Sequence, residues 1–107
     1  MTAQPAFRAL SDPTRRSILR LLGDGEMTVG QVSDRFDMTR AAVKKHLTIL
    51  QEGDLITVRR QGRETWNTLR PAGMEPVRDW IEYFDRFWNA RLGDLKFTTE
   101  NKEIQDD

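Results

Sequence analysis

Apolar residues recur at helical spacing along most of the chain, and one segment instead alternates between apolar and polar positions. Near the N-terminus, a short first helix is predicted around Phe7. Ser11 or Asp12 would cap a second helix with Pro13 in its first position, because proline fits the first turn without losing a helical hydrogen bond. The apolar face of this second helix consists of Ile18, Leu19, Leu21 and Leu22.

Two further helices follow, and a short connection separates them. Thr28 is the predicted N-cap of the first, with Gln31 as its capping-box partner. Thr39 would cap the second, which runs to about Glu52 and ends at Gly53. The apolar positions of the first of these helices are Val29, Val32 and Phe36. Two short helices joined by a tight turn are typical of a helix-turn-helix.

The alternating segment predicts a β-hairpin, with strands at about 55–60 and 64–69 and Gly62 near the turn. From Met74 the helical spacing returns and runs to about Leu95. One stripe of this last helix holds Val77, Ile81, Phe84, Trp88, Leu92 and Leu95. The expected fold class is therefore mainly α with a small β-hairpin.

A chain of 107 residues and 12.5 kDa suits a single domain. Within it we expect a helix-turn-helix core and hairpin at 5–70, a C-terminal helix at 74–97 and a polar tail at 98–107. The absence of cysteine excludes disulfides, thiolate metal sites and cysteine nucleophiles. No signal peptide is visible, and no apolar run is long enough to span a membrane. We therefore expect a cytoplasmic protein.

Charge is unevenly distributed, although the net charge is zero. Residues 1–70 hold 12 Lys/Arg and 8 Asp/Glu, whereas residues 71–107 hold 5 and 9. Between residues 38 and 63 there are six cations and two acids. A charged partner responds to the local electrostatic field rather than to the net charge of the protein. The basic first part is therefore compatible with binding to nucleic acid.

The helix at 39–52 has one apolar face. On a wheel of about 100° per residue, that face consists of Val43, Leu47 and Leu50. His46, the one histidine of the chain, falls beside it. We therefore expect His46 to pack between Ala42 and Ile49, and a supporting contact to phosphate is the alternative.

The opposite face of this helix presents cations and short side chains. A helix that reads the major groove of DNA needs short side chains near base edges and long cationic ones that reach guanine or phosphate. The partial positive charge at its N-terminus adds to this attraction. The alternative is the solvated face of an ordinary amphipathic helix. The face holds Arg40 at its edge, followed by Ala41, Lys44, Lys45, Thr48 and Glu52.

Arginines also gather at the tip of the predicted hairpin, around Gly62. They are Arg59, Arg60 and Arg63. A basic hairpin directly after a basic second helix is the layout of a winged helix-turn-helix, in which arginines at the tip reach the minor groove or the backbone. A polar hairpin that merely tolerates arginine is the alternative. Because helix and hairpin are both basic, DNA binding is favoured over a winged-helix module that binds proteins without touching DNA.

Catalysis is not expected from these residues. Ser11, Ser17 and Ser33 have no evident base partner, and His46 lies beside the apolar face. The Gly-Asp-Gly stretch at 23–25 follows a helix and is too short for a phosphate-binding loop. We therefore predict that the protein is not an enzyme.

Three stretches together resemble the ArsR-type winged-helix transcriptional repressors of bacteria and archaea: FRALSDPTRRSILRLL, MTVGQVSDRFDMTRAAVKKHLTILQEGDLI and VRRQGRETWNTL. The resemblance covers about residues 6–95. It implies a homodimer that binds a near-palindromic operator in double-stranded DNA and represses a nearby operon. Lys44 stands where this family has a small polar residue. The resemblance further implies DNA contacts by Thr39, Arg40, Ala41, Lys44, Lys45 and Thr48, and a wing formed by Arg59, Arg60 and Arg63.

Metal sensing, which founding members of the family perform, is not expected here. Their thiolate site would fall on Thr28 and Gly30, neither of which is cysteine. Their other common site uses Asp and His pairs on the last helix, and residues 74–95 contain no histidine. One histidine without cysteine cannot form a multi-ligand soft site. We expect no metal and no cofactor, and a small-molecule effector of unknown identity stays open.

Five of the nine aromatic residues lie between Trp80 and Trp88. A domain of this size cannot easily bury all of them, and exposed aromatic patches mark partner surfaces. We therefore predict that the C-terminal helix dimerises the protein, which would place two reading helices roughly 34 Å apart. A pocket for an apolar effector and an ordinary intrachain core are the alternatives. The predicted interface consists of Phe7, Val77, Trp80, Ile81, Phe84, Phe87, Trp88 and Leu92.

Overall fold

The computed structural model describes residues 3–91, and it describes side chains as far as Trp88. The chain divides into two compact units, the first ending at Val77 and the second beginning at Arg78. The described residues are mainly helical and contain one small antiparallel sheet. This confirms the expected fold class. No described helix is long and apolar enough to cross a membrane.

Helices α1 (Gln4–Leu10) and α2 (Pro13–Leu22) form as predicted. Asp12 has extended backbone angles, and its carboxylate accepts a hydrogen bond from the backbone N–H of Arg15 at 3.0 Å. This bond satisfies one of the free N–H groups of the first turn, and Pro13 occupies the first position. The aspartate is therefore the cap, rather than the serine before it.

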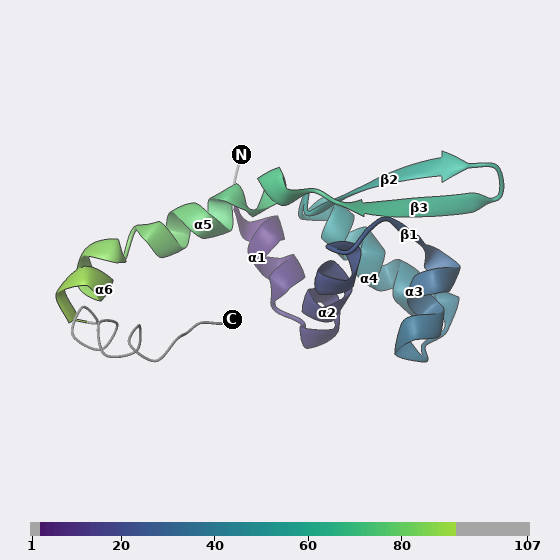
Figure 1. Cartoon of the computed structure of the whole chain (residues 1–107), viewed down its shortest axis with the longest axis horizontal. Helices are drawn as coiled ribbons and strands as arrows, with labels where there is room; N and C mark the ends of the chain where they lie inside the picture. The colour runs from purple at the N-terminus through teal and green to yellow at the C-terminus, as the bar shows by residue number, and fades with distance from the viewer. Residues whose placement is uncertain (1–2, 92–107) are drawn as a thin grey trace. The chain divides into compact units, whose positions relative to one another are not determined.

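Helices α3 (Val29–Phe36) and α4 (Arg40–Glu52) form the helix-turn-helix (Figure 1). Both hydrogen bonds of the capping box are present, at 3.0 Å and 3.1 Å between Thr28 and Gln31. The turn between the helices passes through Asp37, which adopts a left-handed conformation. Thr39 then caps α4 by accepting from the N–H of Ala42. Each predicted cap of the motif is confirmed.

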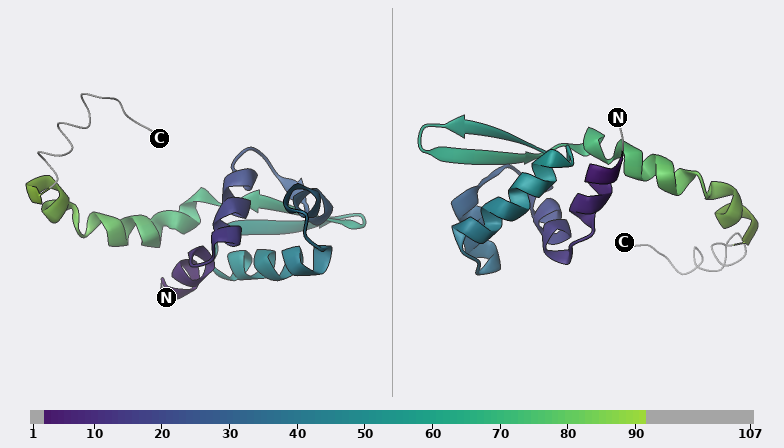
Figure 2. Two further views of the ribbon diagram at one scale, coloured as in Figure 1. Left: turned by 90° about the horizontal axis from the view of Figure 1, so that it is seen from below. Right: turned by 180° about the vertical axis from the view of Figure 1, so that it is seen from behind.

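A three-stranded antiparallel sheet completes the first unit. It consists of β1 (Met27–Thr28), β2 (Ile56–Gln61) and β3 (Glu64–Leu69), in the order β1-β3-β2. The predicted hairpin is confirmed, with Gly62 in the turn at a φ of 63°, a conformation that favours glycine. The tip of the hairpin projects beyond α3 and α4 in every view (Figure 1 and Figure 2). The two-residue strand β1 was not predicted, because it is too short to show an alternating pattern.

The core of the first unit lies among the helices and the base of the sheet. Val43, Leu47 and Leu50 of α4 are buried, as the wheel predicts. The amide of Asn67 is also buried and donates to the backbone oxygen of Met27 at 3.2 Å, which joins β3 to β1. The remaining buried apolar residues are Ala6, Ala9, Ile18, Leu19, Leu22, Val29, Val32, Leu55 and Ile56.

After β3, a short 3-10 helix, η1 (Pro71–Met74), packs tightly against the residues that follow α4. A Cβ added to Gly73 would lie 1.8 Å from the backbone oxygen of Asp54. Position 73 therefore has room for glycine alone.

The expectation of one continuous C-terminal helix from residue 74 is wrong. The structure has α5 (Glu75–Glu82) and α6 (Asp85–Arg91), with a turn at Tyr83 and Phe84. The N–H of Phe84 donates to the oxygen of Ile81, a three-residue spacing that ends α5. Aromatic and β-branched residues form helices less readily than alanine or leucine, and they are concentrated at this point. The end predicted for this helix, including Leu92 and Leu95, lies outside the described residues.

The cap of α2 should make the fold sensitive to acid. The hydrogen bond from the backbone N–H of Arg15 holds the pKa of Asp12 below its ordinary value, and the charges of Arg15 and His46 act in the same direction. A folded-state pKa that is lower than the unfolded one gives stability above the unfolded pKa of about 3.9, and that stability is lost as the pH falls through the folded pKa. In circular-dichroism melts, the melting temperature of Asp12→Asn should therefore fall less between about pH 5 and pH 3 than that of the wild type. Equal losses would show that this cap does not contribute to acid sensitivity.

Candidate nucleic-acid interface

The outward face of α4 is formed by the residues predicted to face DNA. Thr39, Arg40, Ala41, Lys44, Lys45 and Thr48 are all exposed. The buried residues of the same helix anchor it to the core, so this face is held by the fold rather than by its own contacts. Its short side chains leave the helix backbone open to close approach, as a major-groove helix requires.

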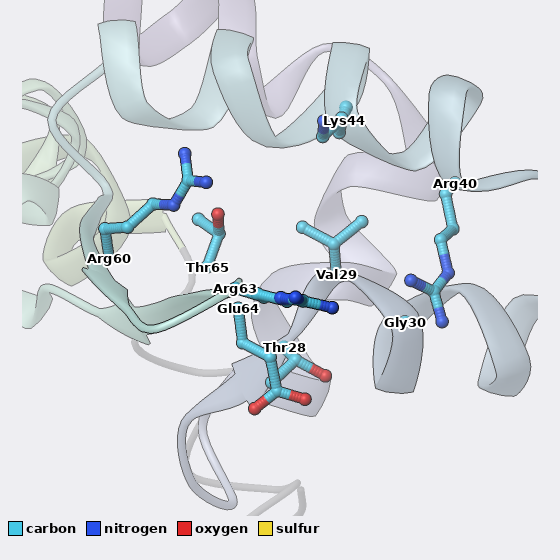
Figure 3. Close-up of a pocket in the computed structure, with 9 residues that line it drawn as sticks. All are labelled: Thr28, Val29, Gly30, Arg40, Lys44, Arg60, Arg63, Glu64 and Thr65. Atoms are coloured by element: carbon cyan, nitrogen blue, oxygen red, sulfur yellow. The ribbon is translucent and has the colours of Figure 1, made fainter.

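A groove of about 210 Å³ lies between α4, the start of α3 and the hairpin (Figure 3). Arg40 and Lys44 line it on the side of the helix, and Arg60 and Arg63 line it on the side of the hairpin. Glu64 is the one carboxylate among the lining residues. Thr28, Val29, Gly30 and Thr65 complete the lining. The structure thus brings the predicted reading helix and the predicted wing together around one cationic groove.

These four cations differ from most other arginines of the first unit in having no protein partner among the described residues. By contrast, Arg70 pairs with the Asp54 carboxylate at 3.0 Å, and Arg8 approaches Glu52 at 3.4 Å. Several unpaired cations around one groove create a strong positive field. Such a field attracts an external anion.

The structure places the three predicted wing arginines in different surroundings. Successive residues of a strand point to opposite faces, so Arg59 lies on the other side of β2 from Arg60. Nη2 of Arg59 lies 2.9 Å and 3.0 Å from the two carboxylate oxygens of Glu26, and its guanidinium lies 5.7 Å from the ring centroid of Trp66. It also donates to Gln61. Arg59 is therefore positioned to brace the hairpin against the segment before β1, and it does not line the groove.

This division predicts opposite effects for two neighbouring arginines. Arg60→Ala should weaken DNA binding and lower its salt dependence by about one phosphate contact. Arg59→Ala should leave the salt dependence nearly unchanged, because the Glu26 carboxylate already offsets that charge. Fluorescence anisotropy of a labelled duplex across salt concentrations measures both variants. An equal reduction of the salt slope by the two variants would contradict the bracing role of Arg59.

His46 joins α4 to the beginning of the chain. The side chain of Arg15, which is 9% exposed, donates to the backbone oxygens of Ala9 at 2.9 Å and Arg8 at 3.0 Å. Its Nη1 lies 3.5 Å from Nδ1 of His46, and the Asp12 carboxylate lies 4.0 Å from the same nitrogen. His46 is half-buried in this cluster and supports the packing of α4. Among residues 3–91, no three His, Cys, Asp or Glu side chains come together as a metal site would need.

The second unit exposes a group of large apolar side chains, which is called here the aromatic face: Trp80, Ile81, Tyr83, Phe87 and Trp88. Between 44% and 60% of each remains accessible. Phe84, less exposed, contacts Trp80 with ring centroids 5.2 Å apart. Tyr83 is the one member that was not among the predicted interface residues. The other predicted interface residues lie elsewhere: Phe7 and Val77 are half-buried in the first unit, and Leu92 is outside the described residues.

Comparison with known proteins gives consistent matches. A family model described as a helix-turn-helix domain matches residues 10–59. The chain is 35% identical over 78 residues to the transcriptional repressor SdpR of Bacillus subtilis, which covers 73% of this chain and 87% of that protein. It is 34% identical over 87 residues to the HTH-type transcriptional regulator Rv2034 of Mycobacterium tuberculosis, covering 81% and 78%.

A solved structure supports the same assignment. The ArsR-like transcriptional regulator from Rhodococcus sp. RHA1 superposes with a TM-score of 0.69 at 30% identity, covering 91% of this chain and 92% of that one. Sequence relatives and fold thus agree over most of the length of each protein. The chain belongs to the ArsR-type winged helix-turn-helix family of transcriptional regulators.

Proposed function

We propose that the protein is a homodimeric, sequence-specific DNA-binding repressor that reads a near-palindromic operator with α4 and contacts its backbone with the wing. The observation that carries this proposal is the groove where four cations without described partners meet, two from α4 and two from the hairpin. A recognition helix in the major groove with a basic hairpin beside it uses this arrangement. The relative SdpR is named a transcriptional repressor, which supports repression rather than activation.

The aromatic face supports the homodimer. Between 44% and 60% of each of its side chains stays exposed among the described residues, and aromatic residues are enriched in protein interfaces. A two-fold dimer on a near-palindromic operator would present its two copies of α4 to successive major grooves, roughly 34 Å apart. Such a protein would act in the cytoplasm, on the chromosome.

A binding experiment across salt tests this function. If about six phosphates are neutralised, the logarithm of the association constant should fall with the logarithm of salt concentration at a slope near −5. We expect this slope in fluorescence anisotropy with duplexes from the promoter of its own gene, together with weaker binding to random duplex of equal length. A flat salt response, or equal affinity for the two duplexes, would contradict a sequence-specific repressor.

The competing function is a winged-helix module that binds proteins and not DNA. Such a module has no need for unpaired cations on both α4 and the hairpin. The same titration separates the two, because the module would show no duplex binding at any salt concentration.

A further inference from the structure

Arg40 lies against a glycine of the neighbouring helix. A Cβ added to Gly30 would lie 2.6 Å from Nη2 of Arg40, 3.0 Å from its Cζ and 3.4 Å from its Nε. The guanidinium group therefore occupies the space that any larger residue at position 30 would fill. Figure 3 shows the Arg40 side chain reaching from α4 to a position beside Gly30.

The local backbone does not explain this glycine. Gly30 lies inside α3, and it is not among the described glycines with positive φ. Glycine is a poor helix former, so alanine would suit this position better if the space beside it were empty. The structure offers one physical reason for glycine at position 30, which is that a larger residue would take the space of the Arg40 guanidinium.

The contact directs Arg40 into the cationic groove. There it joins Lys44, Arg60 and Arg63, and Glu64 offsets one of the four charges. Like charges around one groove repel one another, so an anion bound there relieves the repulsion. A phosphate group suits the groove, because its oxygens can accept charge-assisted hydrogen bonds from several sides at once.

We propose that the groove binds one phosphate of the DNA backbone, and that Gly30 positions Arg40 as one of the groups that hold it. This inference rests on the proposed DNA-binding function. Contacts to phosphate fix the register of a protein on the duplex, whereas contacts to base edges carry the sequence preference. Arg40 therefore sets the register of α4, and base reading falls to the exposed residues outside the groove lining: Ala41, Lys45 and Thr48.

Substitutions on both sides of the contact test the positioning role. Arg40→Ala and Gly30→Ala should each lower affinity for the duplex by roughly five- to tenfold and reduce the salt slope by about 0.9, the value of one phosphate contact. Gly30→Ala should keep or raise the melting temperature, because only the far end of a flexible side chain must move. Arg35→Ala, which removes an exposed cation from the other end of α3, is the matched control and should keep the slope.

A double variant decides the outcome even if Gly30→Ala lowers the melting temperature. In the Arg40→Ala background, alanine at position 30 has room, so Gly30→Ala should cause no further loss of DNA affinity. If Gly30→Ala alone binds as tightly as the wild type, the positioning role is refuted. A further loss in the Arg40→Ala background would refute it as well, because the effect would not pass through Arg40.

Duplexes with a single neutral methylphosphonate test the identity of the ligand. The wild type should lose affinity at one backbone position in each half-site, and Arg40→Ala should be insensitive at that position. A wild type that binds DNA but shows no such position would overturn this inference while leaving the proposed function intact. Inorganic phosphate is the second probe: if it binds the groove in NMR titrations and no methylphosphonate matters, the groove belongs to a small anion. A wild type that binds no duplex at all would instead contradict the proposed function.

Discussion

Lys44→Glu should reduce affinity for the operator duplex by about two orders of magnitude. Lys44 is exposed on α4 and lines the groove that faces the wing. A favourable contact to guanine or phosphate is worth about 1–3 kcal/mol, and the reversed charge adds repulsion from the phosphates. The salt slope should also become shallower by at least about one phosphate contact. Anisotropy titrations at several salt concentrations measure both quantities.

Arg20→Glu provides the matched control for that experiment. It makes the same change of charge at an exposed position of α2, and Arg20 does not line the groove. We expect it to change affinity by a few-fold through the general field alone. Equal losses for the two variants would mean that DNA senses the total charge of the protein, and the assignment of α4 as the reading helix would fail.

Trp88→Ala should convert the proposed dimer into a monomer at micromolar concentration. Nearly half of the Trp88 side chain is exposed on the aromatic face, with 48% accessible. Truncation of a tryptophan at the centre of an interface commonly costs 2 kcal/mol or more, which raises a dimer dissociation constant by about 30-fold. DNA affinity should then fall as a consequence, because each monomer contacts one half-site. Size-exclusion chromatography with light scattering measures the mass directly.

Glu82→Ala is the control for the interface. Glu82 is exposed in the same unit and forms a solvent-exposed ion pair with Arg78, with Nε and Oε2 3.7 Å apart. Exposed pairs of this kind contribute little, so the variant should remain dimeric. If Trp88→Ala also remains dimeric, the interface lies elsewhere, and the aromatic face becomes a candidate surface for another partner.

Local signals in the sequence were sufficient to predict the helix-turn-helix. The caps at Asp12, Thr28 and Thr39 act within three residues, so residue type and spacing locate the starts of α2, α3 and α4. The hairpin was predictable from β-branched residues on either side of Gly62. Strand β1 was missed because its pairing with β3 depends on residues about 40 positions away.

The sequence predicted which residues belong to the candidate site better than it predicted how their side chains are arranged. Exposure of the cationic face of α4 follows from the buried positions of Val43, Leu47 and Leu50, so a helical wheel was enough. Pairing of Arg59 with Glu26 joins residues 33 positions apart, and no local pattern reveals it. Strand alternation could have separated Arg59 from Arg60, since adjacent residues face opposite sides of a strand. The contact between Gly30 and Arg40 needed three-dimensional coordinates.

The end of the C-terminal helix shows where periodicity misleads. Apolar residues kept helical spacing through Tyr83 and Phe84, yet the backbone turns there between α5 and α6. Spacing reports which face is apolar, whereas continuity of a helix depends on backbone propensity and on the groups that pack against it. Residues of the aromatic face lie on both sides of the turn. The predicted interface therefore stays a proposal, although the helix predicted to carry it is interrupted.

Hydroxyl-radical footprinting of the wild-type protein on the promoter DNA of its own gene tests the central claim most directly. Two copies of α4 related by a two-fold axis should protect two short segments whose centres lie about 10–10.5 base pairs apart, with added protection where the wings reach the flanking backbone. Lys44→Glu should erase both segments at the same protein concentration. Uniform protection along the whole fragment, or no protection at concentrations that saturate binding, would contradict the account.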